Sequence, residues 1–130
     1  MTRAAVAILR ENGRVLACQR KKNSRYELKW EFPGGKVEPR ESAEDCVKRE
    51  LHEELSIKVE SIDILKSQLN RYNDGAEFEI TYCLVRRFTG TPLNNAFEQI
   101  QWVTLDELKS MDILEGNKSF VSSLDESIFL

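Results

Sequence analysis

Residues 35–57 read GKVEPRESAEDCVKRELHEELSI, and the interpretation of the whole chain starts from this stretch. Its second part, residues 42–55, has the period of an amphipathic helix, because Val47, Leu51 and Leu55 recur every four positions and form one apolar stripe. Acidic residues lie in the first turn of the segment, where the positive end of the helix dipole favours them. We therefore predict one long helix over residues 42–55 that buries a single stripe.

Three carboxylates of this helix, Glu50, Glu53 and Glu54, lie close together. A step of about 100° per residue places them on one face, beside the apolar stripe rather than opposite it. They are therefore expected at the edge of the core. Like charges at these spacings repel each other and weaken a helix by roughly a few tenths of a kcal/mol per pair. One interpretation is an ordinary solvated face neutralised by Lys48 and Arg49, and the other is a cation site.

The second interpretation draws on the residues upstream of the helix. Gly34 and Gly35 precede the first of these carboxylates and supply flexible backbone near it. Closely spaced carboxylates together with backbone oxygens suit Mg²⁺, a hard cation that prefers oxygen ligands. In such sites metal ions neutralise a polyphosphate while a carboxylate takes a proton from water. The combination predicts chemistry at phosphorus.

Outside this helix, strand-like patterns predict extended segments over 3–9, 14–20, 57–71, 77–88 and 99–103, with clear alternation of apolar and polar residues in 77–88. Asn12-Gly13 favours a tight hairpin between the first two strands. Thr104 can cap a short helix through Leu108, and apolar residues at four-residue spacing predict a last helix over 117–128. Strands in the middle punctuated by helices predict the α+β class, with a mixed sheet between helices.

Composition limits the classes of partner. The net charge of −3, from 19 basic and 22 acidic residues, argues against a stable nucleic-acid partner. No apolar run approaches the roughly 20 residues that span a bilayer, and no secretory signal is recognised, so we expect no membrane partner and a cytoplasmic location. Cys18, Cys46 and Cys83 have no zinc spacing and are interpreted as small buried hydrophobes. A monomer and a homodimer both stay open.

The spacing of fixed residues in 35–57 resembles the signature of the Nudix family, G-x5-E-x7-R-E-U-x-E-E-x-G-U with U apolar. The one departure is Ser56, which stands where the family has a glycine that ends the helix. A serine should adopt that turn at some cost, and because it holds no metal we expect activity to survive. Residues 30–36, WEFPGGK, also look like the segment that precedes this box in MutT-type nucleotide pyrophosphatases.

The resemblance implies a single Nudix domain over residues 1–130 that uses Mg²⁺, or Mn²⁺, to hydrolyse a nucleoside triphosphate to monophosphate and pyrophosphate. An oxidised purine such as 8-oxo-dGTP is the leading substrate, which implies a role in DNA repair. CTP, dinucleoside polyphosphates and RNA 5′ ends stay open as substrates. Tyr72 gives a weak resemblance to the group of the family that acts on dinucleoside polyphosphates. A domain that only binds nucleotides also stays open, although such domains lose box carboxylates that this chain retains.

Roles are implied for box residues and one later residue. The implied catalytic residues are Glu50, Glu53 and Arg49. The implied metal ligands are Gly34 through its carbonyl, Glu50, Glu53, Glu54 and Glu98. Glu50 is either a ligand or the base, Arg49 orients a carboxylate, and Glu41 ties the loop to the helix. Glu98 is the acid that the family often supplies from a later loop, or it is an ordinary loop glutamate.

The implied substrate-binding residues are Arg20, Glu31, Phe32, Gly35, Lys36, Phe78 and Asn117. Asn117 stands where MutT-type relatives have an asparagine that reads a purine base, and its amide offers a donor and an acceptor together. A helix N-cap is the alternative for this residue. Arg20 and Lys36 either contact phosphate or are surface charges. The aromatic residues Phe32, Phe78 and Tyr82 supply either stacking or core.

Overall fold

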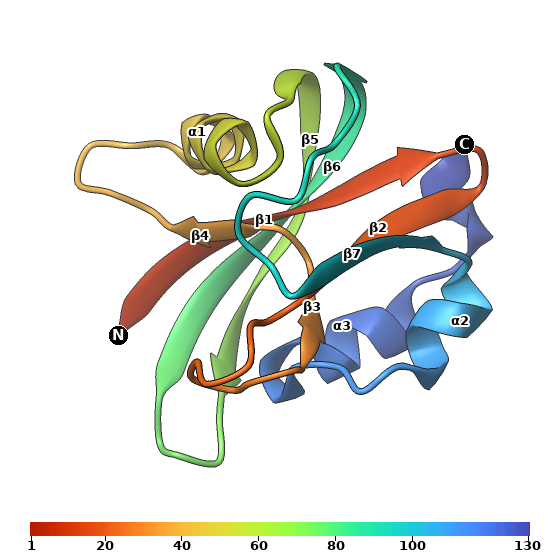
Figure 1. Ribbon diagram of the computed structural model, residues 1–130. Helices are drawn as coiled ribbons and strands as arrows, with labels where there is room; N and C mark the ends of the chain where they lie inside the picture. Colours follow the sequence, from red (N-terminus) through yellow and green to blue (C-terminus); the bar gives the residue numbers. More distant parts are fainter.

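The computed structural model describes residues 1–130 (Figure 1). The strands are β1 (Thr2–Glu11), β2 (Arg14–Gln19), β3 (Trp30–Glu31), β4 (Gly34–Lys36), β5 (Lys58–Arg71), β6 (Glu77–Thr89) and β7 (Gln99–Val103). The helices are α1 (Ala43–Leu55), α2 (Leu105–Ser110) and α3 (Lys118–Ser123), with short 3-10 turns at η1 (Glu115–Asn117) and η2 (Glu126–Phe129). All the strands predicted from alternation are present, and the box helix is α1.

The sheet is mixed, with β1 at its centre. β1 pairs in parallel with β6 and antiparallel with β4 and β2, while β5 forms the outer edge beyond β6. β7 pairs with β2 at the other end. The β1–β2 hairpin turns through Asn12 and Gly13, which both have positive φ angles, of 52° and 73°. A two-residue turn with positive φ at both positions has a twist that matches the twist of the flanking strands. The predicted tight hairpin is therefore confirmed.

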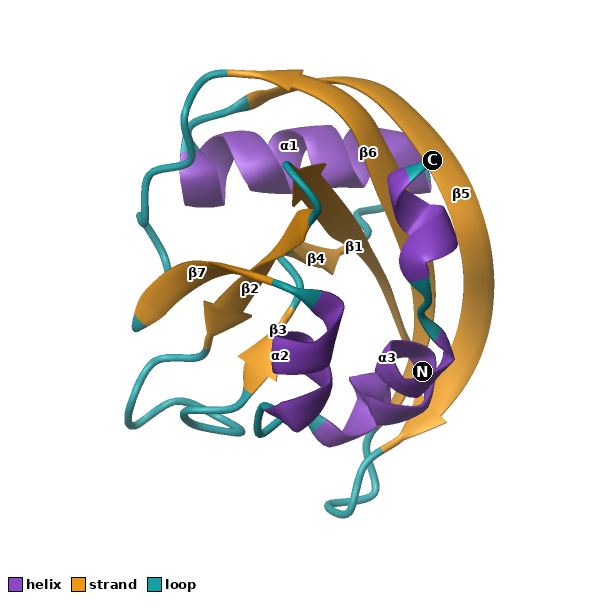
Figure 2. Ribbon diagram, turned by 90° about the vertical axis from the view of Figure 1, so that its right-hand side faces the viewer, coloured by secondary structure: helices purple, strands orange, loops and turns teal.

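Two apolar clusters cover the two faces of the sheet. Neighbouring residues of β1 point to opposite sides, so that Ile8 joins the cluster under α2 and α3 while Leu9 joins the cluster under α1. β6 is buried in the same alternating way, through Tyr82 and Cys83. Figure 2 shows α1 on one side of the sheet and α2 and α3 on the other. This arrangement confirms the predicted α+β fold with a mixed sheet between helices.

Helix α1 begins and ends as its sequence predicts. The Ser42 hydroxyl accepts a hydrogen bond from the Asp45 N–H at 3.1 Å, and the apolar stripe of the helix is fully buried. The helix ends at Ser56, which has the left-handed angles φ 56° and ψ 36°, and the Ser56 N–H donates to the His52 carbonyl at 3.1 Å. Ser56 therefore adopts the conformation that normally favours glycine.

The last helix predicted over residues 117–128 is present only over its first half, as α3. α3 ends at Ser123, Leu124 is extended with φ −71° and ψ 140°, and a separate turn begins after Asp125. The Ser123 hydroxyl donates to the Phe120 carbonyl at 2.6 Å, a local bond that competes with continued helix. The apolar residues that suggested the helix are nevertheless buried. Their spacing therefore identified core residues correctly but not the backbone that connects them.

Two further features bear on the sequence predictions. Cys18, Cys46 and Cys83 are buried and form no disulfide, as expected of small core hydrophobes. None of the helices combines the length and the apolar composition that crossing a bilayer requires.

Replacing Ser56 by glycine is expected to raise the free energy of unfolding by about 0.5–1 kcal/mol, because glycine adopts the left-handed region without strain. The change also removes the hydrogen bond that Ser56 Oγ accepts from Asn95 Nδ2 at 2.8 Å, which is exposed and contributes less. Urea unfolding measures the difference. Ser56→Ala is the matched control, since it keeps the strain and loses the bond, and it should lower stability. Equal stabilities for the two variants would contradict the strain argument.

Candidate active site

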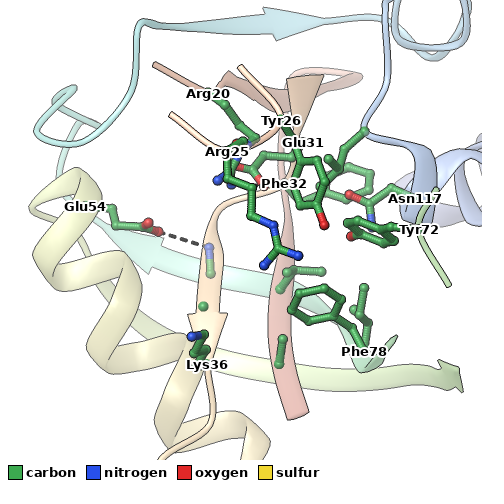
Figure 3. Close-up of a pocket in the computed structure, with 16 residues that line it drawn as sticks. Arg20, Arg25, Tyr26, Glu31, Phe32, Lys36, Glu54, Tyr72, Phe78 and Asn117 are labelled. Carbon is green, nitrogen blue, oxygen red and sulfur yellow. Dashed lines mark hydrogen bonds and ion pairs between the residues drawn. The ribbon is translucent and has the colours of Figure 1, made fainter. Parts of the chain in front are cut away.

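A cavity of about 350 Å³ opens between β1, β4, β6, the loop after β2 and the start of α3 (Figure 3). Every residue that the resemblance assigns to substrate binding lines this cavity: Arg20, Glu31, Phe32, Gly35, Lys36, Phe78 and Asn117. Two of the expected metal ligands, Gly34 and Glu54, line it as well. The α1 carboxylates and the cavity therefore adjoin each other along β4.

The glycine pair lets β4 lie close to both of its neighbours, with Gly34 against β1 and Gly35 against α1. Gly34 has φ +144°, and a Cβ there would lie 2.2 Å from the Ala5 carbonyl oxygen, so no larger residue fits. A Cβ on Gly35 would lie 2.6 Å from Cδ of Glu50, which means that the Glu50 carboxyl group packs directly on this glycine. The Gly34 N–H donates to Glu54 Oε1 at 3.0 Å. Two of the helix carboxylates thus meet the backbone of β4.

Arg49 holds the carboxylates on the outer side of the helix. Its guanidinium donates to Glu41 at 2.8 Å and to Glu50 at 2.9 Å, and it lies 3.8 Å from Glu53. The hydrogen bonds from Arg49, with a further bond from the Glu38 N–H, lower the pKa of Glu41 to about 2. Arg49 and Glu41 together connect the loop before α1 to the helix.

Glu54 binds its proton unusually tightly. Burial raises the pKa of Glu54 to about 8, and repulsion from Glu50, Glu31 and Glu53 adds to the effect. Burial also raises the pKa of Glu50, against the opposing ion pair with Arg49. The negative charge at this edge of α1 is therefore only partly compensated by the protein. A bound cation would neutralise the negative charge that the protein leaves uncompensated.

The groups that could hold such a cation are all oxygen donors, which suits a hard divalent ion. They are the carboxylates of Glu50, Glu53 and Glu54 and the backbone of Gly34. No three acidic, histidine or cysteine side chains converge closely enough to enclose an ion, because Glu50 faces Arg49 and Glu54 faces the Gly34 N–H. The residues fit a divalent cation by the chemistry of their donors and by the uncompensated charge around them.

Glu98 lies outside this group. Its carboxylate accepts a hydrogen bond from the Lys22 N–H at 3.1 Å, and its own N–H donates to the Gln19 carbonyl at 2.9 Å. It does not line the cavity. The arrangement favours the alternative interpretation of Glu98 as a loop glutamate that fixes the segment after β2.

Arg20 faces the cavity rather than bulk solvent. Its guanidinium donates to both carboxylate oxygens of Glu31, at 3.1 and 3.2 Å, and to the Arg25 carbonyl at 2.7 Å. Burial raises the pKa of Glu31, and Arg20 opposes that rise. The pair is thus a fixed charged feature of the cavity wall, with Arg20 held in one orientation.

The sequence analysis missed part of the aromatic wall. Tyr26, in the loop after β2, contacts Tyr72 with ring centroids 4.9 Å apart, and both residues line the cavity. Asp74 accepts hydrogen bonds from the Tyr26 hydroxyl at 2.6 Å and from Arg25 at 2.7 Å, which ties this loop to the β5–β6 turn. The only sequence signal for this part of the wall was one tyrosine, Tyr26, in an otherwise polar and basic loop.

Asn117 does not act as a helix cap. Its side chain makes no capping hydrogen bond to α3, so that alternative is wrong. The residue is buried, lines the cavity, and donates from Nδ2 to the Tyr82 hydroxyl at 2.9 Å. Of the three aromatic residues considered for stacking, Tyr82 is core, whereas Phe32 and Phe78 line the cavity.

The sequence and the structure of this chain are similar to those of known proteins. The family model described as NUDIX domain matches residues 1–124. The 8-oxo-dGTP diphosphatase of Escherichia coli (strain K12) is 30% identical over 121 residues, covering 92% of this chain and 93% of that protein. The CTP pyrophosphohydrolase of the same strain is 33% identical over 107 residues, covering 82% and 78%. The crystal structure of a MutT NUDIX hydrolase from Burkholderia pseudomallei matches with a TM-score of 0.85 at 26% identity, over 95% of this chain and 98% of that chain.

The stability of the metal-free protein should depend on pH through Glu54. Its pKa is about 8 when folded against 4.5 as the reference, so the folded state binds the proton more tightly. The resulting stabilisation is complete below pH 4.5 and is lost as the pH rises through about 8. We therefore expect the free energy of unfolding, measured with urea and a chelator, to fall over this range. Glu54→Gln should remove most of the fall and Glu44→Gln should not, and an unchanged slope in Glu54→Gln would contradict the assignment.

Proposed function

Because this chain belongs to the Nudix hydrolase family, we propose that it hydrolyses a nucleoside triphosphate to the monophosphate and pyrophosphate, with a purine nucleotide such as 8-oxo-dGTP as the preferred substrate. The proposal rests on one observation, the cavity that adjoins the carboxylate edge of α1. Relatives named 8-oxo-dGTP diphosphatase and CTP pyrophosphohydrolase support it. The proposal includes a single domain over residues 1–130 and a cytoplasmic location, which the unpaired thiols suit.

Members of this family generally use divalent cations. In this chain we assign the ion to Glu50, Glu53, Glu54 and the Gly34 carbonyl, and we take it to be Mg²⁺, or Mn²⁺ in its place. When bound, such an ion neutralises the polyphosphate and polarises its phosphorus–oxygen bonds. Glu98 is left out of this set because its carboxylate is engaged by the Lys22 N–H.

The protein's own groups would divide the remaining work. The Glu53 side chain is 58% exposed and makes only a 3.8 Å contact with Arg49, so it is open to water and suited to accept a proton. The Glu50 side chain is 17% exposed and is held by Arg49 at 2.9 Å, which fixes its direction. Arg49 is thus assigned to orienting carboxylates rather than to contacting substrate.

The nucleotide would lie in the cavity with its phosphates toward α1. Arg20, fixed by Glu31, and Lys36 supply positive charge for phosphate oxygens. At the far end, Phe78 offers an apolar ring and Asn117 offers an amide to the edge of the base. This orientation brings the phosphoanhydride bonds next to the α1 carboxylates.

A domain that only binds nucleotides is the alternative from another class. It would need the cavity but not the acidic edge of α1, and the chain retains Glu50, Glu53 and Glu54 there. The acidic edge is costly to fold, since burial and mutual repulsion raise the pKa of Glu54. Because the chain keeps these carboxylates although they are unfavourable for folding, we favour an enzyme over a binding domain.

A panel assay tests the proposed function directly. Phosphate and pyrophosphate release is measured with Mg²⁺ and with Mn²⁺ on purine and pyrimidine nucleoside triphosphates, 8-oxo-dGTP, dinucleoside polyphosphates and 5′-triphosphate RNA. We expect pyrophosphate and a nucleoside monophosphate from a purine triphosphate. Tight binding without any turnover would establish the binding module instead, and a preference for CTP, for a dinucleoside polyphosphate or for 5′-triphosphate RNA would correct the substrate class.

Glu53→Gln should lower kcat by about 100-fold or more, because the amide can neither accept a proton nor neutralise a cation. Glu44→Gln is the matched control, since it removes a carboxylate from the first turn of the same helix and should leave kcat within about twofold. Steady-state turnover on the preferred nucleotide measures both variants. A Glu53→Gln protein that is folded and fully active would remove Glu53 from the catalytic set.

A further inference from the structure

A second hollow lies on the outer flank of α1, where the helix runs beside the start of β5 (Figure 1). This outer groove is open to solvent, has a volume of about 510 Å³, and is walled by Lys48, Arg49, His52, Glu53 and Lys58. It shares no residue with the nucleotide cavity, which α1 reaches only through Glu54. The outer groove is therefore a separate feature of the molecule, to which the proposed function gives no role.

The acidic edge of α1 lies between the two hollows. Glu54 lines the nucleotide cavity, whereas Glu53 lines the outer groove. A step of about 100° per residue places Glu50 between these two carboxylates around the helix axis. Glu50 is held at 2.9 Å by Arg49, which itself lines the outer groove. A cation bound along this edge therefore has the nucleotide cavity on one side and the outer groove on the other.

The outer groove contains two lysines that the protein leaves unpaired. Lys48 in α1 and Lys58 at the start of β5 are exposed, and neither forms an ion pair with an acidic side chain. The acidic residues of the groove are Asp45, two turns before the end of the acidic edge, and Glu53, which we assign to the cation. Once a cation neutralises Glu53, positive charge predominates in the outer groove.

The chemistry of the proposed reaction supplies an anion of suitable charge and size. Hydrolysis divides a nucleoside triphosphate into a monophosphate, which carries the base, and pyrophosphate, which is small and carries several negative charges. With the base in the cavity and the phosphates toward α1, the pyrophosphate half is the part that reaches furthest across the acidic edge. A lysine ammonium group binds phosphate oxygens as a mobile point charge, without the fixed geometry that an arginine requires.

We propose that the outer groove is an anion subsite that receives the leaving pyrophosphate, with Lys48 and Lys58 as its binding residues. The inference rests on the proposed function in one respect, that the reaction releases pyrophosphate across the α1 edge. The nucleoside monophosphate stays in the cavity. The two products therefore leave from opposite sides of the acidic edge, and each can depart without the other.

Ordinary surface lysines make a different prediction. If the cation alone held the pyrophosphate, Lys48 and Lys58 would only be solvated charges, and inhibition by pyrophosphate would not depend on them. Inhibition by the two products separates these roles, because the monophosphate occupies the cavity and the pyrophosphate occupies the groove. The variants leave Glu50, Glu53 and Glu54 unchanged, so the residues assigned to the cation are the same in every protein compared.

The experiment measures product inhibition with Mg²⁺ in excess, by following release of the nucleoside monophosphate or loss of the triphosphate. Lys48→Gln and Lys58→Gln should each raise the inhibition constant of pyrophosphate about threefold, and the double variant about tenfold. The inhibition constant of the monophosphate should stay within about twofold, because neither lysine lines the cavity. Lys66→Gln is the matched control, since Lys66 is an exposed lysine of β5 that lines neither hollow, and it should change neither constant.

A charge-conserving pair of variants tests whether the positive charge is what binds. Lys48→Arg and Lys58→Arg should keep the inhibition constant of pyrophosphate within about twofold of the wild-type value, because a guanidinium also contacts phosphate oxygens. Unchanged inhibition by pyrophosphate in the folded double glutamine variant would overturn the proposal. An equal loss of inhibition by the monophosphate would overturn it as well.

Failure of the proposed function is distinguishable from failure of this inference. If the wild-type protein hydrolyses no nucleotide, calorimetry measures the Kd of pyrophosphate with Mg²⁺ for the wild-type protein and the double glutamine variant. Binding that is about tenfold weaker in the variant would support the anion subsite without any turnover. Equal binding by the two proteins, or the absence of binding by the wild-type protein, would refute it.

Discussion

The close approach of α1 to β4 is the constraint on which the rest of the site depends. A side chain at Gly34 would strike the Ala5 carbonyl oxygen, and one at Gly35 would strike the Glu50 carboxyl group. Because Gly35 lacks a Cβ, the helix lies close to β4, and Glu54 accepts the Gly34 N–H. The same two glycines line the cavity. A larger residue at Gly35 would therefore move the acidic edge of the helix away from the cavity, and one at Gly34 would move β4 away from β1.

This closeness has an electrostatic cost that the fold tolerates. Burial and neighbouring carboxylates raise the pKa of Glu54 to about 8, and only Arg49 offsets the charge on the outer side. The helix survives because its apolar stripe is fully buried against the sheet, and apolar burial outweighs repulsion of roughly a few tenths of a kcal/mol per like-charged pair. An arrangement that weakens the empty protein and favours a cation is what a metal-dependent hydrolase requires.

The parts of the molecule that could be predicted from sequence are those whose signals are local. The box helix, the Asn12-Gly13 hairpin and the alternating strands each depend on neighbours within a few residues. The last helix was predicted too long because its apolar spacing continues past Ser123, where the helix ends and the Ser123 hydroxyl donates to the Phe120 carbonyl. The wall formed by Tyr26 and Tyr72 could not be predicted, since these residues come from separate segments that only the sheet topology brings together.

The two ends of the cavity therefore have different origins. The end of the cavity next to α1 is formed largely within residues 30–57, by Gly34, Gly35, Lys36 and Glu54. The far end of the cavity is assembled from separate segments, since Tyr72 follows β5, Phe78 lies in β6 and Asn117 precedes α3. Because the acidic edge of α1 and the far end of the cavity come from separate segments, the sequence of one can change while the other stays intact, and the chain resembles relatives that are named for different nucleotides.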